Sequence, residues 1–364
     1  HNKERYDTYY FAGDFADQGE VPSIYQTSFY PVWKKWTEKI GKEDESSFYW
    51  TVYLPLMNKI IDQQQNASQP ASVTFNENME IYEDADRKVA GKVGKDYLQV
   101  YQNGKWKDLL IKGVNMGISK PGHFPGETAI SKEEYLRWFK EIGKMNANSI
   151  RVYTIHPPGF YEALAEYNQK AKEPIYLFHG VWVNEEVFYD SQDAFAKENT
   201  KEFEAEMKRI VNVIHGNATL PKRTGHASGT YTADVSPYVL GWIIGVEWDP
   251  TVALSTNKKH KGMKDFKGKY IYTEKGNPFE IWLAQLMEKT ISYEQDKYDW
   301  QRPMSFTNWV TTDLLTHPYE PSEDEDKVSV NPNLIHTTKK FEPGLFASYH
   351  IYPYYPDFLN YEPR

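Results

Sequence analysis

The sequence predicts an α/β fold in which parallel strands alternate with helices, and three observations lead to this prediction. Residues 238–246 form an unbroken apolar run, which is typical of a strand buried on both faces of a parallel sheet. From residue 109 onward, such runs alternate with segments of helical periodicity. Residues 107–364 also suit the length of a closed barrel of βα units, typically ~250 residues. Together these features predict a TIM-barrel architecture of the (β/α)8 type.

Six strands are expected in this part of the chain. They are residues 109–116, 149–155, 174–183, 238–246, 302–309 and 345–352. A closed barrel has eight strands. The polypeptide is therefore predicted to stop before the seventh strand, and a strand count that is wrong by two is the alternative. The loops at 249–276 and 311–343 each follow a strand, so they are expected to wall a cleft on the active face.

Helical patterns fill the segments between the strands. Ser131 is followed three residues later by Glu134, the pattern of a capping box. Asn277 and Pro278 are the residue types that favour a helix start. Helices are expected over 131–145, 160–167 and 203–214, and from 277 onward.

The chain before the barrel has a different character. Residues 1–66 are interpreted as an accessory segment of unclear fold. Residues 67–106 look β-rich, and Asn103-Gly104 is a strong hairpin signal because both residues tolerate positive φ. We expect this hairpin region to lead into the barrel domain, residues 107–364, and to close its N-terminal end.

Composition excludes several classes of function. The net charge is −9, which argues against binding to nucleic acid or to an anionic membrane. No apolar run approaches the ~20 residues of a membrane span. Cysteine is absent, so disulfides, thiolate metal sites and cysteine nucleophiles are excluded. The ten His residues show no metal-ligand spacing, and no cofactor is expected. The predicted location is extracellular or cell-surface, and a cytoplasmic location stays open.

Candidate functional residues gather where the predicted strands end. The central one is Glu247, which follows the apolar run directly and precedes Trp248. A carboxylate there is costly unless function requires it, and active sites of barrels form at the C-terminal ends of the strands. The other candidates at strand ends are Asn115, Arg151, Tyr153, His156, Trp182, Trp248, Asn308, Trp309, Tyr349, His350 and Tyr352.

The residue types in this set indicate a site for sugars. Aromatic residues make up 16% of the chain, with 28 Tyr, 18 Phe and 11 Trp, and the surplus suggests surfaces that stack on flat apolar faces such as sugar rings. Asn, Arg and His side chains can bind sugar hydroxyls, and a carboxylate can give a proton to a leaving oxygen. An oligo- or polysaccharide is the predicted partner.

Several candidates also have a purely structural interpretation. Arg151 could pair with an interior carboxylate, and His350 could be a core histidine. Trp242 is interpreted as packing, and Asp249 as a residue that shapes the turn before a proline. The adjacent acidic residues 185 and 186 are interpreted as the solvated start of a helix.

Three motifs resemble the catalytic barrel of clan A retaining glycosidases. IKGVNMG at 111–117 is similar to the first-strand motif of the family 2 β-glycosidases and of fungal-type β-glucanosyltransferases. NSIRVYTIHPPGFYEAL at 148–164 resembles their second strand and following helix, and SYHIYPYYPDF at 348–358 resembles their sixth strand. The most similar group is that of uncharacterised bacterial family 2-like barrel proteins.

The resemblance implies roles for individual residues. The general acid/base Glu of those families ends the fourth strand and maps onto Glu247, while their nucleophile ends the seventh strand. Arg151 maps onto the arginine that holds the nucleophile, and Tyr349 with His350 maps onto substrate contacts. Val246 replaces the Asn that binds the sugar 2-hydroxyl, which points away from ordinary hydrolysis or assigns that role to another group, Asn308 or Trp248.

Two hypotheses about function follow. In the first, the chain is a retaining β-glycosidase or transglycosidase in which Glu247 is the general acid/base and a second carboxylate, ~5 to 5.5 Å away, forms the glycosyl-enzyme. Burial beside Trp248 is then expected to raise the pKa of Glu247. In the second hypothesis, the chain is a non-catalytic carbohydrate-binding or scaffolding barrel.

Overall fold

The computed structural model describes residues 80–318 and 322–352. The chain divides into two compact units, residues 1–73 and 74–364, and every described residue belongs to the second unit. The predicted accessory segment and the first part of the hairpin region therefore lie outside the described residues.

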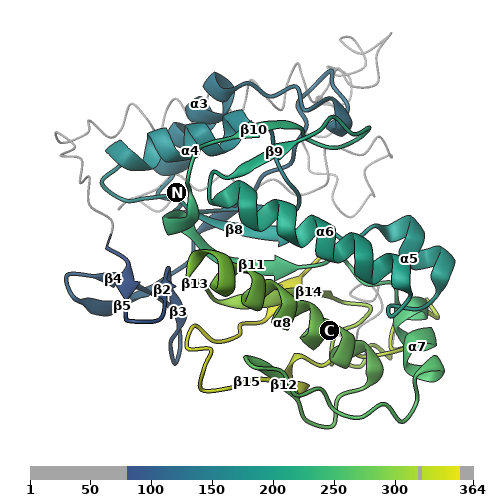
Figure 1. Ribbon diagram of the computed structural model, residues 1–364. Helices are drawn as coiled ribbons and strands as arrows, with labels where there is room; N and C mark the ends of the chain where they lie inside the picture. The colour runs from purple at the N-terminus through teal and green to yellow at the C-terminus, as the bar shows by residue number, and fades with distance from the viewer. Residues whose placement is uncertain (1–79, 319–321, 353–364) are drawn as a thin grey trace, which may run out of the picture. The chain divides into compact units, whose positions relative to one another are not determined.

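A parallel sheet of six strands forms the centre of the fold (Figure 1). Its strands are β6 (Gly113–Asn115), β7 (Ser149–Val152), β8 (Tyr176–Val181), β11 (Val239–Ile244), β14 (Met304–Trp309) and β16 (Ser348–His350). Each strand pairs in parallel with the next one in this order. All six lie within the ranges predicted from the sequence. The strand predictions are thus confirmed, and so is the α/β class with a parallel sheet.

The prediction of a (β/α)8 barrel is not confirmed. The six strands curl into a half-barrel, and β6 and β16 are edge strands with one neighbour each among the described residues. A barrel closes only when its two edge strands pair with each other, directly or through further strands. In the described ranges, no strand fills the place between these two edges.

Six helices follow strands or precede them along the described chain (Figure 1). They are α3 (Lys132–Lys144), α4 (Pro158–Lys170), α5 (Glu185–Ser191), α6 (Lys197–Ile214), α7 (Pro250–Lys259) and α8 (Pro278–Tyr298). Their apolar faces and the outward-facing residues of the strands, such as Ile150 and Ile244, form one large core. This packing covers the convex side of the sheet.

The starts of two helices agree with the sequence-based predictions. Ser131 and Glu134 form the predicted capping box, in which each side chain bonds the backbone N–H of the other residue. Helix α8 begins at Pro278 as expected, although Asn277 makes no side-chain cap bond. Helix α7 lies in a segment that was predicted as loop, and Asp249 caps it through a 2.9 Å bond from the Val252 N–H.

A small antiparallel sheet covers part of the concave side. It contains β3 (Lys92–Val93), β4 (Leu98–Gln102) and β5 (Lys105–Leu109), and Asn103 and Gly104 turn between the last two with φ of 53° and 69°. The predicted hairpin is thereby confirmed. Val100 of this sheet packs with Tyr176 and Leu240, near the beginnings of β8 and β11.

Short elements complete the described chain. They are β1 (Tyr82–Glu83), β2 (Lys88–Val89), η3 (Pro125–Glu127), β9 (Ala218–Leu220), β10 (Gly229–Tyr231), η4 (Ser236–Tyr238), β12 (Ile271–Thr273), β13 (Trp300–Gln301), η5 (Pro332–Leu334) and β15 (Ile335–Thr337). Over the described ranges, no helix has both the length and the apolarity needed to cross a membrane.

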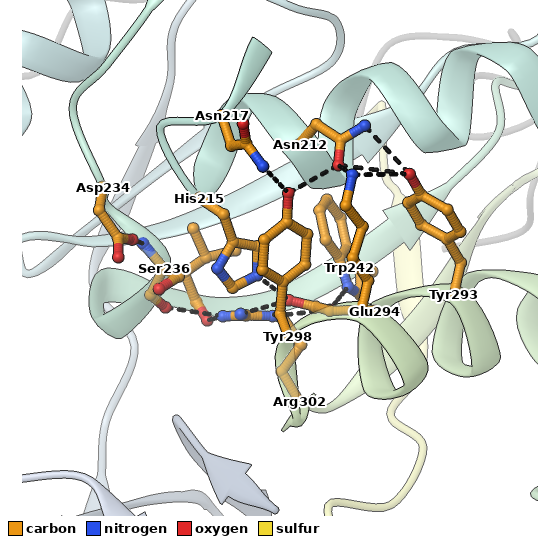
Figure 2. A network of polar contacts seen from close by, with 12 residues as sticks. Asn212, His215, Asn217, Asp234, Ser236, Trp242, Tyr293, Glu294, Tyr298 and Arg302 are labelled. Atoms are coloured by element: carbon orange, nitrogen blue, oxygen red, sulfur yellow. Dashed lines mark hydrogen bonds and ion pairs between the residues drawn. The ribbon is translucent and has the colours of Figure 1, made fainter.

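A buried polar network fixes the beginning of β11 (Figure 2). Glu294 of α8 accepts hydrogen bonds from Arg302 (2.6 Å), from His215 (3.0 Å) and from the indole of Trp242 (2.8 Å). Arg302 also donates to the backbone carbonyls of Ser236 and Val239. The network therefore ties two helices to the first residues of the central strand.

The charges in this network are compensated. Burial alone would raise the pKa of Glu294, but the Arg302 charge and the bonds from His215 and Arg302 lower it to about 2. Every donor that reaches the carboxylate has a buried side chain, since Trp242 and Arg302 are each 1% exposed and the His215 side chain is 4% exposed. This arrangement, at the N-terminal end of the strands, is structural, and Trp242 packs as the sequence predicted.

Candidate functional site at the C-terminal ends of the strands

The turn after β11 sets the position of Glu247. Gly245 has a φ of 86°, and its N–H donates to the Val181 carbonyl at 2.9 Å. A Cβ on Gly245 would lie 2.0 Å from the Trp248 indole, so only glycine fits beneath that ring. The indole is fully buried against Phe188, at a ring distance of 5.7 Å. Trp248 thus anchors the turn. The Glu247 side chain is 30% exposed at the edge of the sheet formed by the C-terminal ends of the strands, which we call the rim.

Two hydrogen bonds converge on one oxygen of Glu247. His350 Nδ1 lies 2.6 Å from Oε1, and the Tyr352 hydroxyl donates to the same atom. The other ring nitrogen of His350 lies 2.7 Å from Arg151 Nη1. A guanidinium can only donate, so His350 Nε2 accepts and its proton must sit on Nδ1. His350 therefore donates to Glu247 through Nδ1.

Arg151 makes further contacts that hold this network in place. Its second terminal nitrogen donates to Thr307 Oγ1 at 3.1 Å, and its guanidinium lies 4.6 Å from the centre of the Tyr153 ring. The interior carboxylate that was considered as its partner is not found among the described residues, where Arg151 makes no ion pair. Arg151 instead bonds His350, which in turn donates to Glu247.

These contacts decide the protonation state of Glu247. Burial would raise its pKa, but the hydrogen bonds from His350 and Tyr352 and the positive charge of Arg151 outweigh burial and lower it. The prediction that burial beside Trp248 raises the pKa of Glu247 is therefore wrong. The contact with Glu247 has the opposite effect on the pKa of its partner. Burial and the hydrogen bond to Glu247 raise the pKa of Tyr352 to about 12. Glu247 is an ionised carboxylate at neutral pH.

Exposed aromatic rings stand around this carboxylate at the strand ends. Trp182 follows β8 and is 37% exposed, and Tyr352, which contacts Glu247, is 41% exposed. Tyr349 is 37% exposed, but it pairs in register with Asn308 and lies on the opposite face of β16 from His350. Trp309 ends β14, and its indole donates to the Trp248 carbonyl at 2.9 Å, which fixes the ring at the rim. Tyr153 lies beside His350, with ring centres 6.0 Å apart.

Three predicted site residues lie in the core instead. His156 is 1% exposed and bonds the Tyr135 hydroxyl at 2.9 Å, and burial lowers its pKa to about 3. Asn308 is equally buried and donates to the Val330 carbonyl at 2.9 Å, which holds the loop after β14. Trp248 is the anchor described above. None of the three presents its side chain at the rim.

Asn115 belongs to a neighbouring part of the concave face. With Arg151 it lines a cavity of about 360 Å³, whose walls are otherwise mostly apolar and include Phe178, Ile243 and Phe346. Arg151 is the residue that connects this cavity to the Glu247 network. The sequence analysis missed Thr307, which also contacts Arg151. Period-two alternation along β14 places Thr307 on the same face as Trp309 and is the signal that could have found it.

The described residues contain no group of three side chains that could hold a metal ion. No protein-family model, no curated protein and no solved structure matches the chain. The resemblance to clan A retaining glycosidases, and to family 2 in particular, is therefore corrected: no family match supports it, and the described sheet is a half-barrel of six strands. The assignments that depended on that resemblance alone are withdrawn, and the chemistry of the site rests on its own geometry.

Proposed function

We propose that the rim around Glu247 is the active site of a carbohydrate-active enzyme that cleaves β-glycosidic bonds of oligo- or polysaccharides with retention of configuration. The acceptor is water or a second sugar. One observation carries this proposal: an ionised carboxylate, held by two hydrogen bonds at the end of the central strand, stands among exposed aromatic rings. Cleavage of a glycoside needs a fixed carboxylate near the anomeric carbon and a surface that binds the ring.

The surroundings of the carboxylate suit a sugar better than an apolar ligand. Trp182 and Tyr352 offer large, partly exposed ring faces, while Arg151 and His350 supply polar groups. Aromatic rings with a polar edge bind amphipathic ligands well. A saccharide has this character, since its ring carries apolar C–H faces and polar hydroxyls at the edge.

The lowered pKa of Glu247 limits the catalytic roles that this side chain can take. An ionised carboxylate can attack the anomeric carbon or accept a proton from water, whereas a general acid must first carry a proton. The sequence-based role of general acid/base and the role of nucleophile therefore predict different effects of substitution. Replacing the nucleophile stops turnover of every substrate, and replacing an acid/base spares substrates that have good leaving groups.

The test is Glu247→Gln assayed with aryl β-glycosides of graded leaving-group ability. We expect turnover of phenyl glycosides to fall by at least about 100-fold, the usual scale for an acid, base or nucleophile. The matched control is Glu173→Gln, an exposed glutamate before β8 at the other end of the strands, which should retain full activity. Turnover that survives intact in Glu247→Gln contradicts the proposal.

A non-catalytic carbohydrate-binding protein is the second candidate. It is favoured by one observation: the groups that contact Glu247 directly, His350 and Tyr352, include no second carboxylate. If the protein is a carbohydrate-binding protein, the wild type should bind oligosaccharides without forming any product. Glu173→Gln should bind them with the same affinity as the wild type.

A further inference from the structure

A second acidic side chain stands on the same rim. Glu185 is the first residue of α5, four positions after Val181 at the end of β8. Strands β8 and β11 are neighbours, and Val181 pairs with Ile244, three positions before Glu247. The two glutamates thus leave the sheet side by side at its C-terminal edge, because adjacent parallel strands end at the same edge.

Glu185 lies on the face of α5 that packs against the turn carrying Glu247. Phe188 lies three residues after Glu185, so the two share one face of α5. Phe188 is buried, and its ring lies 5.7 Å from the ring of Trp248, the residue that follows Glu247. A second contact of Phe188, also at 5.7 Å, joins it to Trp282 of α8 and fixes the helix in this orientation.

The electrostatics of the pair agree with this placement. Burial raises the pKa of Glu185, and the negative charge of Glu247 raises it further. The pKa of Glu247 moves in the opposite direction, as described above. Tyr189 and Asp249 are the other ionisable groups nearby, since both Glu185 and Asp249 act on the Tyr189 phenol. Two carboxyl groups whose pKa values are pushed apart are the usual arrangement of an acid and a base.

We propose that Glu185 is the proton donor of the site and that Glu247 is its partner carboxylate. This inference rests on the proposed function, and it replaces the interpretation of Glu185 as a solvated helix start. It also supplies the second carboxyl group that cleavage requires without any residue outside the described chain.

The two glutamates divide the reaction into two balanced steps. The Glu247 carboxylate attacks the anomeric carbon while the bond from that carbon to the leaving oxygen breaks, and Glu185 transfers its proton to that oxygen. The Glu185 carboxylate then takes a proton from a water molecule, whose oxygen attacks the anomeric carbon. The bond to Glu247 breaks, and both glutamates return to their starting protonation states.

The test compares Glu185→Gln with Glu186→Gln, its exposed neighbour in the same helix turn. For Glu185→Gln we expect kcat/KM to fall at least 100-fold with phenyl β-glycosides and less than tenfold with dinitrophenyl β-glycosides, whose leaving group needs no proton. The alkaline limb of the pH dependence of kcat/KM should also disappear. Because Glu185 is also the base of the second step, kcat should fall for the dinitrophenyl substrate, and azide should restore it. Glu186→Gln should behave as the wild type in all three measurements.

The outcomes separate this inference from the proposed function. If Glu247→Gln is inactive but Glu185→Gln matches Glu186→Gln across the leaving-group series, Glu185 is not the donor and the glycosidase proposal stands. If the wild type cleaves no aryl glycoside, both proposals fail. Circular dichroism and a Glu185→Asp variant identify a loss that comes from misfolding, because a folded Glu185→Asp protein should keep the alkaline limb that the glutamine variant lacks.

Discussion

Two glutamates near the two ends of β11 have very different surroundings. Glu294, at the beginning of the strand, is fully buried and is neutralised by Arg302. Glu247, after the end of the strand, is partly exposed and accepts hydrogen bonds from His350 and Tyr352. At the residue scale, the buried carboxylate has a structural role at one end of the sheet, and the proposed site lies at the other end.

Removal of the histidine donor should change the ionisation of Glu247. In His350→Ala, Glu247 loses a charge-assisted hydrogen bond that stabilises its ionised form. We expect the pKa of Glu247 to rise. A ¹³C titration of the side-chain carboxyl measures it directly, with Glu173 in the same spectrum as the reference. A pKa that stays where it is in the wild type would show that His350 does not control this carboxylate.

The aromatic rim should contribute to binding more than to turnover. Trp182→Ala removes a ring face, and a stacking contact of this kind is worth about 0.5–1.5 kcal/mol. We therefore expect a rise in KM of up to about tenfold, with little change in kcat. Tyr97→Ala is the control, because Tyr97 is similarly exposed (48%) but lies beside the β4–β5 hairpin. An equal effect of both variants would contradict a specific role of Trp182.

The sequence predicted which residues lie near the strand ends, but not the contacts between them. The abrupt end of an apolar run at Glu247 is a local pattern, and so it could be recognised. The contact between Arg151 and His350 joins residues 199 positions apart in the chain, and no local pattern encodes it. Burial raises the pKa of Glu247, but the hydrogen bonds from His350 and Tyr352, which are also distant in the chain, lower it. Reasoning from burial alone therefore predicted the wrong direction.

At the scale of elements, the long and strongly periodic helices and the start of α5 were predictable, and α7 was not. The capping box at Ser131 and the apolar face of α6 identify their helices directly. Helix α7 has ten residues and lies in segment 249–276, which was predicted as a loop that follows a strand. Tertiary packing of Val252 and Ala253 stabilises it, which local periodicity does not reveal.

The capping box of α3 offers a test of a single element. Ser131→Ala removes the hydrogen bond to the Glu134 N–H, and loss of such a cap typically costs about 1 kcal/mol. We expect the free energy of unfolding, measured in urea, to fall by that amount. Ser131→Asp is the matched control, since aspartate caps as well as serine does. If alanine and aspartate give the same stability, the cap contributes nothing.

The network around Glu294 should matter more. Glu294→Gln leaves the Arg302 charge buried without its partner, and breaking a buried ion pair on one side costs about 3–5 kcal/mol. Urea unfolding at neutral pH measures this loss. Asp296→Asn, an exposed change on the same helix, should shift stability by less than about 0.5 kcal/mol. A Glu294→Gln protein as stable as Asp296→Asn would refute the structural role of the network.

At the scale of the whole molecule, the same carboxylate makes stability depend on pH. The pKa of Glu294 is about 2 in the folded protein, below the ~4.3 of a glutamate in an unfolded chain. A depressed pKa stabilises the fold fully above the unfolded value, and this contribution is lost as pH falls toward the folded value. We expect the stability difference between wild type and Glu294→Gln to shrink by roughly 3 kcal/mol between pH 6 and pH 2. A difference independent of pH would contradict the shifted pKa.

The order of the strands could be predicted from the sequence, and the closure of the sheet could not. Each strand appears as a local apolar run, and the chain order of those runs proved to be their order in the sheet. Whether the edges of β6 and β16 meet depends on strands that pair with both, and counting runs does not establish that. The half-barrel nevertheless brings β8, β11 and β16 to one rim, which is what the proposed chemistry requires.

We propose that the ionised Glu247 at this rim drives cleavage of glycosidic bonds. The most direct test is a ¹H NMR time course of β-linked oligosaccharides of glucose, mannose and galactose with the wild type and Glu247→Gln. The wild type should release new anomeric signals from at least one of these sugars, first with the configuration of the substrate, and Glu247→Gln should release none. Product formation at equal rates by both proteins, or by neither, would contradict the claim.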